Sequence, residues 1–184
     1  MAYEPVFPTA LQPLALALLP ILRANEVAVE SPDGFLTLVM SEQLLAPYRV
    51  YYAAEGLRAT IAETSGDTRL LALCLGTRHW DGYLREECLR LLMAAERPWA
   101  APFIVQLLGE YVVEIAQTIL AALQQGYVAD LAEFVRDNPS FMATTKRRII
   151  SYWDCYYRRD FPSLQDYPAR AALELVEKMA FSTG

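Results

Sequence analysis

The chain is poor in the residues that build metal sites and disulfide frameworks. Its 184 residues include one histidine, His79, and three cysteines, Cys74, Cys88 and Cys155. The cysteines are odd in number and none belongs to a CxxC pair, so neither a zinc site nor a disulfide framework is expected. The sequence also lacks a Gly-rich phosphate loop and the GxSxG and HExxH motifs. We therefore expect no metal, no cofactor and no catalytic residues.

Long apolar runs are also lacking. The N-terminal apolar stretch from Leu14 to Leu22 contains Pro20 and is nine residues long, whereas a helix needs about 20 residues to cross a bilayer. Glu4 precedes the stretch and no Lys or Arg occurs before Arg23, which is unlike a secretory signal peptide. These features predict a cytoplasmic protein with reduced thiols and no membrane association.

Positive charge is scarce. The chain has 16 Lys and Arg against 22 Asp and Glu, a formal net charge of −6, and 54% of its residues are hydrophobic. Affinity for nucleic acid comes mainly from neutralising phosphates with Lys and Arg, so a nucleic-acid partner is not expected. An acidic surface suits a partner protein with a basic surface instead. The apolar content excludes disorder, and the length fits one domain.

Apolar residues recur at helical spacing along most of the chain, which predicts an all-α fold. A first helix is expected over residues 14–22, kinked or shortened by Pro20. Gly, Pro and Asn-Pro breaks delimit the remaining helices. These are expected near residues 47–63, 67–77, 81–95, 99–108, 110–124, 127–137, 139–158 and 165–181.

Residues 26–40 hold the one weak β signal. Val27 and Val29 lie at alternate positions, and the sequence Pro32-Asp33-Gly34 is typical of a turn. Two interpretations are open here: a short hairpin, or a loop that runs into a helix from about residue 36.

The clearest motif is DGYLREECLRLL, residues 81–92. Asp81 can cap a helix, Leu84 begins a buried stripe, Arg85 can pair with an acid of a neighbouring repeat, and small residues such as Cys88 allow close helix packing. A second copy, residues 109–120, follows 28 residues later, with Gly and Val in place of the acid and the arginine. A third, weaker copy begins near Asn138.

This motif resembles the second helix of a HEAT repeat, and the resemblance covers about residues 67–158. It implies a short HEAT-like α-α superhelix built from stacked helix pairs. In that interpretation, residues 1–184 form a single helical-repeat domain, with 1–65 as an atypical N-terminal cap and 159–184 as a C-terminal helix cap. An irregular helical bundle with accidental periodicity is the alternative.

Two segments rich in Tyr and Arg are the candidate partner-binding sites, because Tyr, Trp and Arg dominate interface hot spots. Residues 141–184 carry 7 basic and 5 acidic groups, whereas residues 1–140 carry 9 and 17. The same aromatic residues can instead form a buried stripe with arginines at its edges. The candidates in the two segments are Tyr48, Tyr51 and Tyr52, then Arg147, Arg148, Tyr152, Trp153, Tyr156 and Arg158.

Four acids, Glu86, Glu87, Glu110 and Glu114, are interpreted as an acidic surface, of which Glu110 and Glu114 are candidate partner-binding residues. His79 lies in a turn beside Asp81 and is expected to be structural.

The sequence thus favours a non-enzymatic protein–protein interaction module, either an adaptor or an immunity protein that neutralises a toxin. The alternative is an enzyme on a HEAT-like scaffold. Similarity to helical-repeat DNA glycosylases would imply roles for Trp153, Tyr156 and Asp154 near Arg147, Arg148 and Arg158, but the net charge opposes DNA binding.

Overall fold

The computed structural model describes residues 6–27, 33–127 and 131–181. The chain divides into two compact units, Met1–Ala95 and Glu96–Gly184. The predicted all-α class is confirmed, because helices make up most of the described structure and the β structure is a small two-stranded sheet. The expectation that the whole chain forms one continuous domain stays a prediction.

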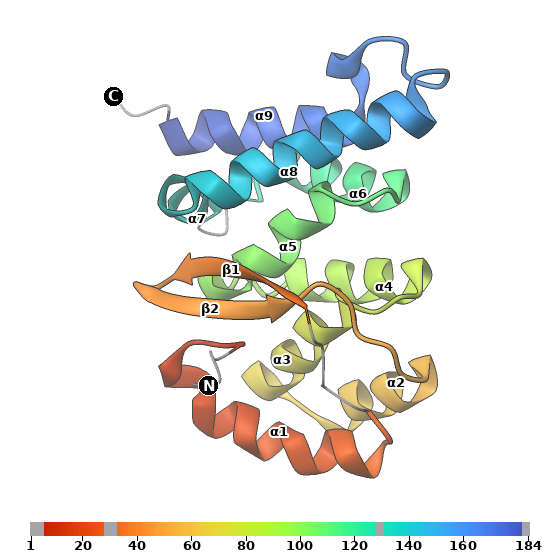
Figure 1. Cartoon of the computed structure of the whole chain (residues 1–184). Coiled ribbons are helices and arrows are strands. Elements are labelled where there is room, and N and C mark those ends of the chain that lie inside the picture. Colours follow the sequence, from red (N-terminus) through yellow and green to blue (C-terminus); the bar gives the residue numbers. More distant parts are fainter. Residues whose placement is uncertain (1–5, 28–32, 128–130, 182–184) are drawn as a thin grey trace. The chain divides into compact units, whose positions relative to one another are not determined.

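The first unit is built around one central helix. After a 3-10 turn, Thr9–Leu11, it contains α1 (Gln12–Ala24), β1 (Gly34–Val39), β2 (Glu42–Pro47), α2 (Ala54–Glu63), α3 (Gly66–Gly76) and α4 (Gly82–Met93). Helix α3 packs against α1, α2 and α4 (Figure 1). Residues 71–76 of α3 are all buried, so this helix supplies the core of the unit.

Helix α1 continues through Pro20, which neither ends nor shortens it. Proline removes the hydrogen bond to the carbonyl of the residue four positions earlier, which here is Leu16. Leu16 is exposed, so this carbonyl lies on the solvent side of the helix, where water can satisfy it.

The hairpin that was one of two interpretations for residues 26–40 exists, but it lies further along the chain. Strands β1 and β2 pair antiparallel, with Val39 opposite Glu42 and Gly34 opposite Pro47. The alternative, a helix from about residue 36, is wrong. Residues 28–32, which include part of the expected turn, lie outside the described residues.

The predicted helix over residues 47–63 begins later, at Ala54. The preceding residues join β2 to α2, and Val50 forms an isolated parallel bridge with His79. This pairing with a distant segment replaces helical hydrogen bonding at the start of the predicted helix.

The second unit consists of helices packed around α5 and α9. It contains a 3-10 turn (Pro98–Ala100), α5 (Ala101–Leu108), α6 (Val113–Gln124), α7 (Leu131–Asp137), α8 (Pro139–Tyr152), a π-helical turn (Trp153–Tyr157), a 3-10 turn (Leu164–Asp166) and α9 (Pro168–Phe181). Helix α9 packs against α5, α6, α7 and α8, and lies beside α8 (Figure 1). Every residue of α5 is buried and all but Gln106 are apolar, as is typical of a helix in the centre of a core.

Candidate functional site

His79 lies at the centre of a hydrogen-bonded frame in the first unit and is fully buried. Its Nδ1 accepts the backbone N–H of Asp81 at 3.0 Å, so the ring proton must be on Nε2. Nε2 in turn donates to the carbonyl of Tyr52 at 2.8 Å. Because both ring nitrogens are engaged with backbone groups, His79 joins two chain segments and presents no nitrogen to a substrate.

Arg85 also holds the turn that contains His79 and Trp80 and leads into α4. Its guanidinium is buried, and Nη1 donates to the carbonyls of His79 and Trp80, both at 2.9 Å. The carboxylate of Asp81 accepts the backbone N–H of Tyr83 at 2.9 Å, which confirms that Asp81 caps α4. The turn before α4 is therefore held by side chains on both of its flanks.

Three aromatic side chains project from this rigid frame. Val50 and His79 are paired and buried, and side chains alternate along paired extended segments. The next residue of each segment, Tyr51 and Trp80, is accordingly exposed, at 75% and 56%, and Tyr83 in the first turn of α4 is 85% exposed. We name Tyr51, Trp80 and Tyr83 the aromatic triad.

The indole N–H of Trp80 points to the carbonyl of Tyr52 at 3.4 Å, which ties the triad to its frame. Tyr52 itself is buried. Tyr48 is half-buried and its ring lies 5.5 Å from that of Phe35. Of the three tyrosines predicted in this segment, only Tyr51 is therefore largely open to a partner.

Sequence reasoning missed Trp80 and Tyr83 as surface residues. Both lie within the motif region around Asp81 that was interpreted as structural. The available signal was that large aromatic residues stand one residue before and two residues after a helix cap, where side chains of the first turn often face solvent.

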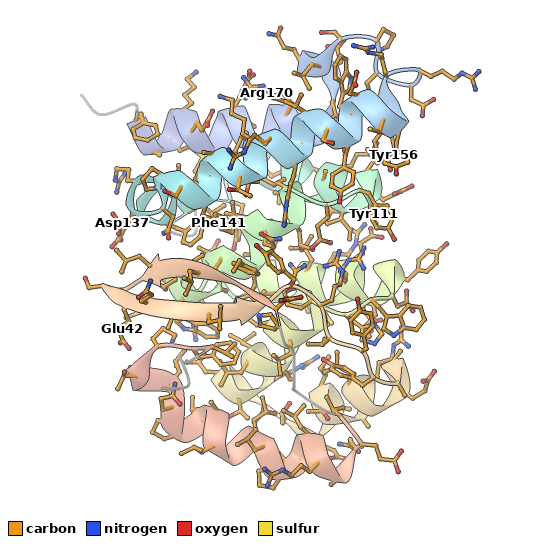
Figure 2. The ribbon with its side chains drawn as sticks, in the orientation of Figure 1. Glu42, Tyr111, Asp137, Phe141, Tyr156 and Arg170 are labelled. Carbon is orange, nitrogen blue, oxygen red and sulfur yellow. The ribbon has the colours of Figure 1, made fainter. Side chains whose placement is uncertain are left out.

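A second aromatic group lies in the second unit, where α8 ends and α6 begins. The ring of Tyr152 lies 6.3 Å from that of Tyr111 and 6.2 Å from that of Tyr156. Tyr111 and Tyr156 are 51% and 68% exposed, and Figure 2 shows them at the same end of α8. We name Tyr111, Tyr152 and Tyr156 the tyrosine ladder.

Tyr157 anchors the tyrosine ladder to α6. Its hydroxyl donates to the carbonyl of Tyr111 and accepts the backbone N–H of Val113. Its ring stacks on that of buried Tyr167, with centroids 5.3 Å apart. Removal from water, more than any neighbouring charge, raises the pKa of Tyr157, so its hydroxyl stays protonated and able to donate.

Trp153 and Arg158 form a compact group beside the tyrosine ladder. The indole N–H of Trp153 donates to the carbonyl of Phe161 at 2.8 Å, and the guanidinium of Arg158 lies 4.9 Å from the centre of the Trp153 ring. Arg158 also pairs with Asp154 at 3.0 Å. Among the remaining predicted residues, Arg147 is exposed and Arg148 is half-buried.

The predicted acidic surface is wrong for Glu110, which is buried. Glu114 is exposed. Glu86 pairs with Arg90 at 2.6 Å and Glu87 with Arg58 at 3.1 Å, so arginines offset both of these charges. Glu86 and Glu87 belong to the first unit, whereas Glu110 and Glu114 belong to the second.

Within residues 6–27, 33–127 and 131–181, no group of three or more His, Cys, Asp and Glu side chains is arranged to hold a metal ion. None of the helices in this part of the chain combines the length and apolar content needed to cross a bilayer. No protein-family model, no curated protein and no solved structure matches the chain.

Proposed function

We propose that this protein is a non-enzymatic protein-binding module and that the aromatic triad of the first unit is its main contact surface. The observation that carries the proposal is the exposure of Tyr51, Trp80 and Tyr83 on a frame held by buried His79 and Arg85. Large aromatic side chains held in place lose little entropy on binding, and Tyr and Trp are the commonest hot-spot residues.

Charge favours a partner with a basic surface. The first unit, residues 1–95, contains 7 Arg and 11 Asp and Glu, a net charge of −4. Opposite charge on the partner would speed association and align it with the aromatic triad. A basic enzyme or toxin held by an immunity protein, or a basic client held by an adaptor, fits this description.

The hydrogen bonding of the predicted catalytic candidates supports a binding role over an enzymatic one. Both nitrogens of His79 are engaged with the backbone. Asp154, the carboxylate that a glycosylase-like enzyme would need, is ion-paired with Arg158. A general base must present a free acceptor atom to its substrate, and His79 presents none, whereas the charge of Asp154 is offset by Arg158.

A HEAT-like origin and a cytoplasmic location are parts of the same proposal. Asp81 caps α4 and α4 packs against α3, as the repeat interpretation requires within the first unit, whereas Nη1 of Arg85 donates to backbone carbonyls of its own turn. Free Cys74, Cys88 and Cys155 suit a reducing compartment.

The test is a comparative affinity purification from lysate of the native host. The tagged wild-type chain is expected to retain one dominant protein in near-stoichiometric amount. A Trp80→Ala/Tyr83→Ala variant should bind that protein, once purified, at least about 10-fold more weakly by calorimetry, because each hot-spot truncation costs about 2 kcal/mol or more.

Phe181→Ala is the matched control, since Phe181 is equally exposed and lies in the other unit. Equal retention of the partner by wild type, control and double variant would refute a role for the aromatic triad. Recovery of the wild-type chain alone would refute the binding-module proposal itself.

A further inference from the structure

Positive charge is concentrated in one short part of the second unit. Residues 139–159 contain five basic residues and one acid, a net charge of +4 in a chain whose total is −6. Helix α8 contributes Lys146, Arg147 and Arg148 and contains no acid. Two residues of the tyrosine ladder belong to this segment, because Tyr152 ends α8 and Tyr156 follows in the π-helical turn.

The two sides of α8 differ in burial. Met142, Thr145 and Ile149 are buried and form its inner side. Residues at spacings of three and four on the other side are exposed, and they combine cations with apolar side chains. These residues, Ala143, Lys146, Arg147 and Ile150, are named the α8 face; Ile150 is 41% exposed.

We propose that the α8 face docks a short acidic amphipathic segment of a partner protein. Carboxylates of the segment would pair with Lys146 and Arg147, whose guanidinium can bind a carboxylate with two parallel hydrogen bonds. Its apolar side chains would cover Ile150 and Ala143. The 14 residues of α8 span about 21 Å, which matches a partner helix of similar length.

Charge around the α8 face favours a short segment over an extended polyanion. Outside residues 139–159, the second unit contains 4 basic and 10 acidic residues, a net charge of −6. These include exposed Glu133 and Asp137 on α7, a helix that packs against α8. A nucleic acid or an anionic bilayer would extend past the basic face and meet this negative charge. A short acidic segment would not.

This inference does not depend on the aromatic triad. The triad belongs to the first unit and suits a basic partner, whereas the α8 face belongs to the second unit and suits an acidic one. Loss of binding through Trp80 and Tyr83 variants would leave the α8 face untouched, so the two proposals fail separately.

The test uses the full chain and a fluorescein-labelled synthetic peptide of about 18 residues, with Glu and Leu at helical spacing. Binding is measured by fluorescence anisotropy at low salt. A peptide in which every Glu is replaced by Gln should bind at least about 10-fold more weakly, and raising the salt concentration should weaken binding of the acidic peptide.

Charge reversal locates the site. Lys146→Glu/Arg147→Glu should weaken binding of the acidic peptide at least about 10-fold, because attraction becomes repulsion. Arg69→Glu/Lys178→Glu changes the net charge by the same amount at exposed positions on α3 and α9 and should have less than about a 2-fold effect. Ile150→Ser tests the apolar contact and should weaken binding with little change in salt dependence.

Two other anionic ligands serve as controls: a labelled single-stranded oligonucleotide of the same length and vesicles containing phosphatidylserine. Three outcomes would overturn the proposal: equal losses of binding in the two charge-reversal variants, no binding of the acidic peptide at low salt, or tighter binding of either control ligand than of the peptide. Circular dichroism of each variant verifies that the helices are retained.

Discussion

The hydroxyl of Tyr157 donates a hydrogen bond to the backbone carbonyl of Tyr111. The same oxygen accepts the backbone N–H of Val113, the first residue of α6. Amides in the first turn of a helix have no hydrogen-bond acceptor within the helix. The side chain of Val112, at the N-cap position, is apolar and cannot accept a hydrogen bond from them. A tyrosine from the π-helical turn therefore caps α6, and this contact holds the tyrosine ladder in place.

Tyr157→Phe removes both hydrogen bonds while keeping the ring stacked on Tyr167. We expect the free energy of unfolding to fall by about 1–2 kcal/mol, the usual effect of losing a helix cap. Urea denaturation followed by circular dichroism measures it. Tyr156→Phe is the control, because Tyr156 is exposed and should change stability by less than about 0.5 kcal/mol. Equal stabilities of the two variants would show that the Tyr157 bonds give no net stabilisation.

The helices could be predicted because their signals are local. Apolar spacing and Gly or Pro breaks placed α3, α4 and α5 to within a few residues, and the predicted cap at Asp81 is present. Residues 48–53 were mispredicted as helical because Val50 pairs with His79, a partner 29 residues away that leaves no trace in local spacing.

Exposure of the aromatic residues could not be predicted from their spacing. Tyr51 and Tyr52 are neighbours in the same predicted helix, yet one is exposed and the other buried, because alternation along an extended segment separates them. Glu110 was expected at the surface because it is charged, and its burial depends on packing that only the folded chain shows. Composition identified the Tyr-rich segments but not the residues in them that a partner can reach.

Gly76 of α3 lies in close contact with α4. A Cβ at this position would lie 2.3 Å from Sγ of Cys88 and 3.0 Å from Cδ2 of Leu57. Gly76→Ala should therefore lower the free energy of unfolding by about 1–3 kcal/mol through overpacking. Thermal and urea denaturation measure the effect.

The cause can be checked with a second substitution. Cys88→Ala removes the sulfur atom that the new methyl group would meet, so the double variant should be less destabilised than the sum of the two single variants. Strict additivity would mean that the Gly76 effect does not arise from this contact.

The three cysteines should differ in reactivity. Burial raises the pKa of Cys88 to about 12 and raises that of Cys74 as well, whereas Cys155 is exposed. The thiolate is the reactive form, so at pH 8 an aromatic disulfide reagent should modify one thiol rapidly in the native protein and three after unfolding. Cys155→Ser should abolish the rapid phase; a rapid phase that persists would contradict the burial of the other two.

The same shifts set a pH dependence of stability. The ordinary pKa of a thiol is near 9.0, so above that pH the unfolded chain loses protons that buried Cys74 and Cys88 retain. Stability is therefore fully present below about pH 9 and should decline as the pH rises toward the folded pKa values. Urea midpoints at increasing alkaline pH should fall less steeply in Cys88→Ala than in the wild-type chain. Equal slopes would show that Cys88 ionises alike in both states.

The hairpin turn is made by two residues that rarely adopt its conformation. Met40 and Ser41 connect the Val39–Glu42 pair with φ values of 52° and 66°. A two-residue turn with both φ values positive is type I′, which favours Asn-Gly, and the absence of that signal explains why the position of the hairpin was mispredicted. Ser41→Gly should raise the free energy of unfolding by about 0.5–1 kcal/mol, because glycine adopts positive φ without steric cost. Ser41→Ala removes the hydroxyl but retains the Cβ, so it should give no such gain. Urea denaturation of the three chains compares them, and native-state hydrogen exchange of β1 and β2 should slow in the glycine variant alone. A gain shared by both variants would assign the effect to the lost hydroxyl and not to backbone strain.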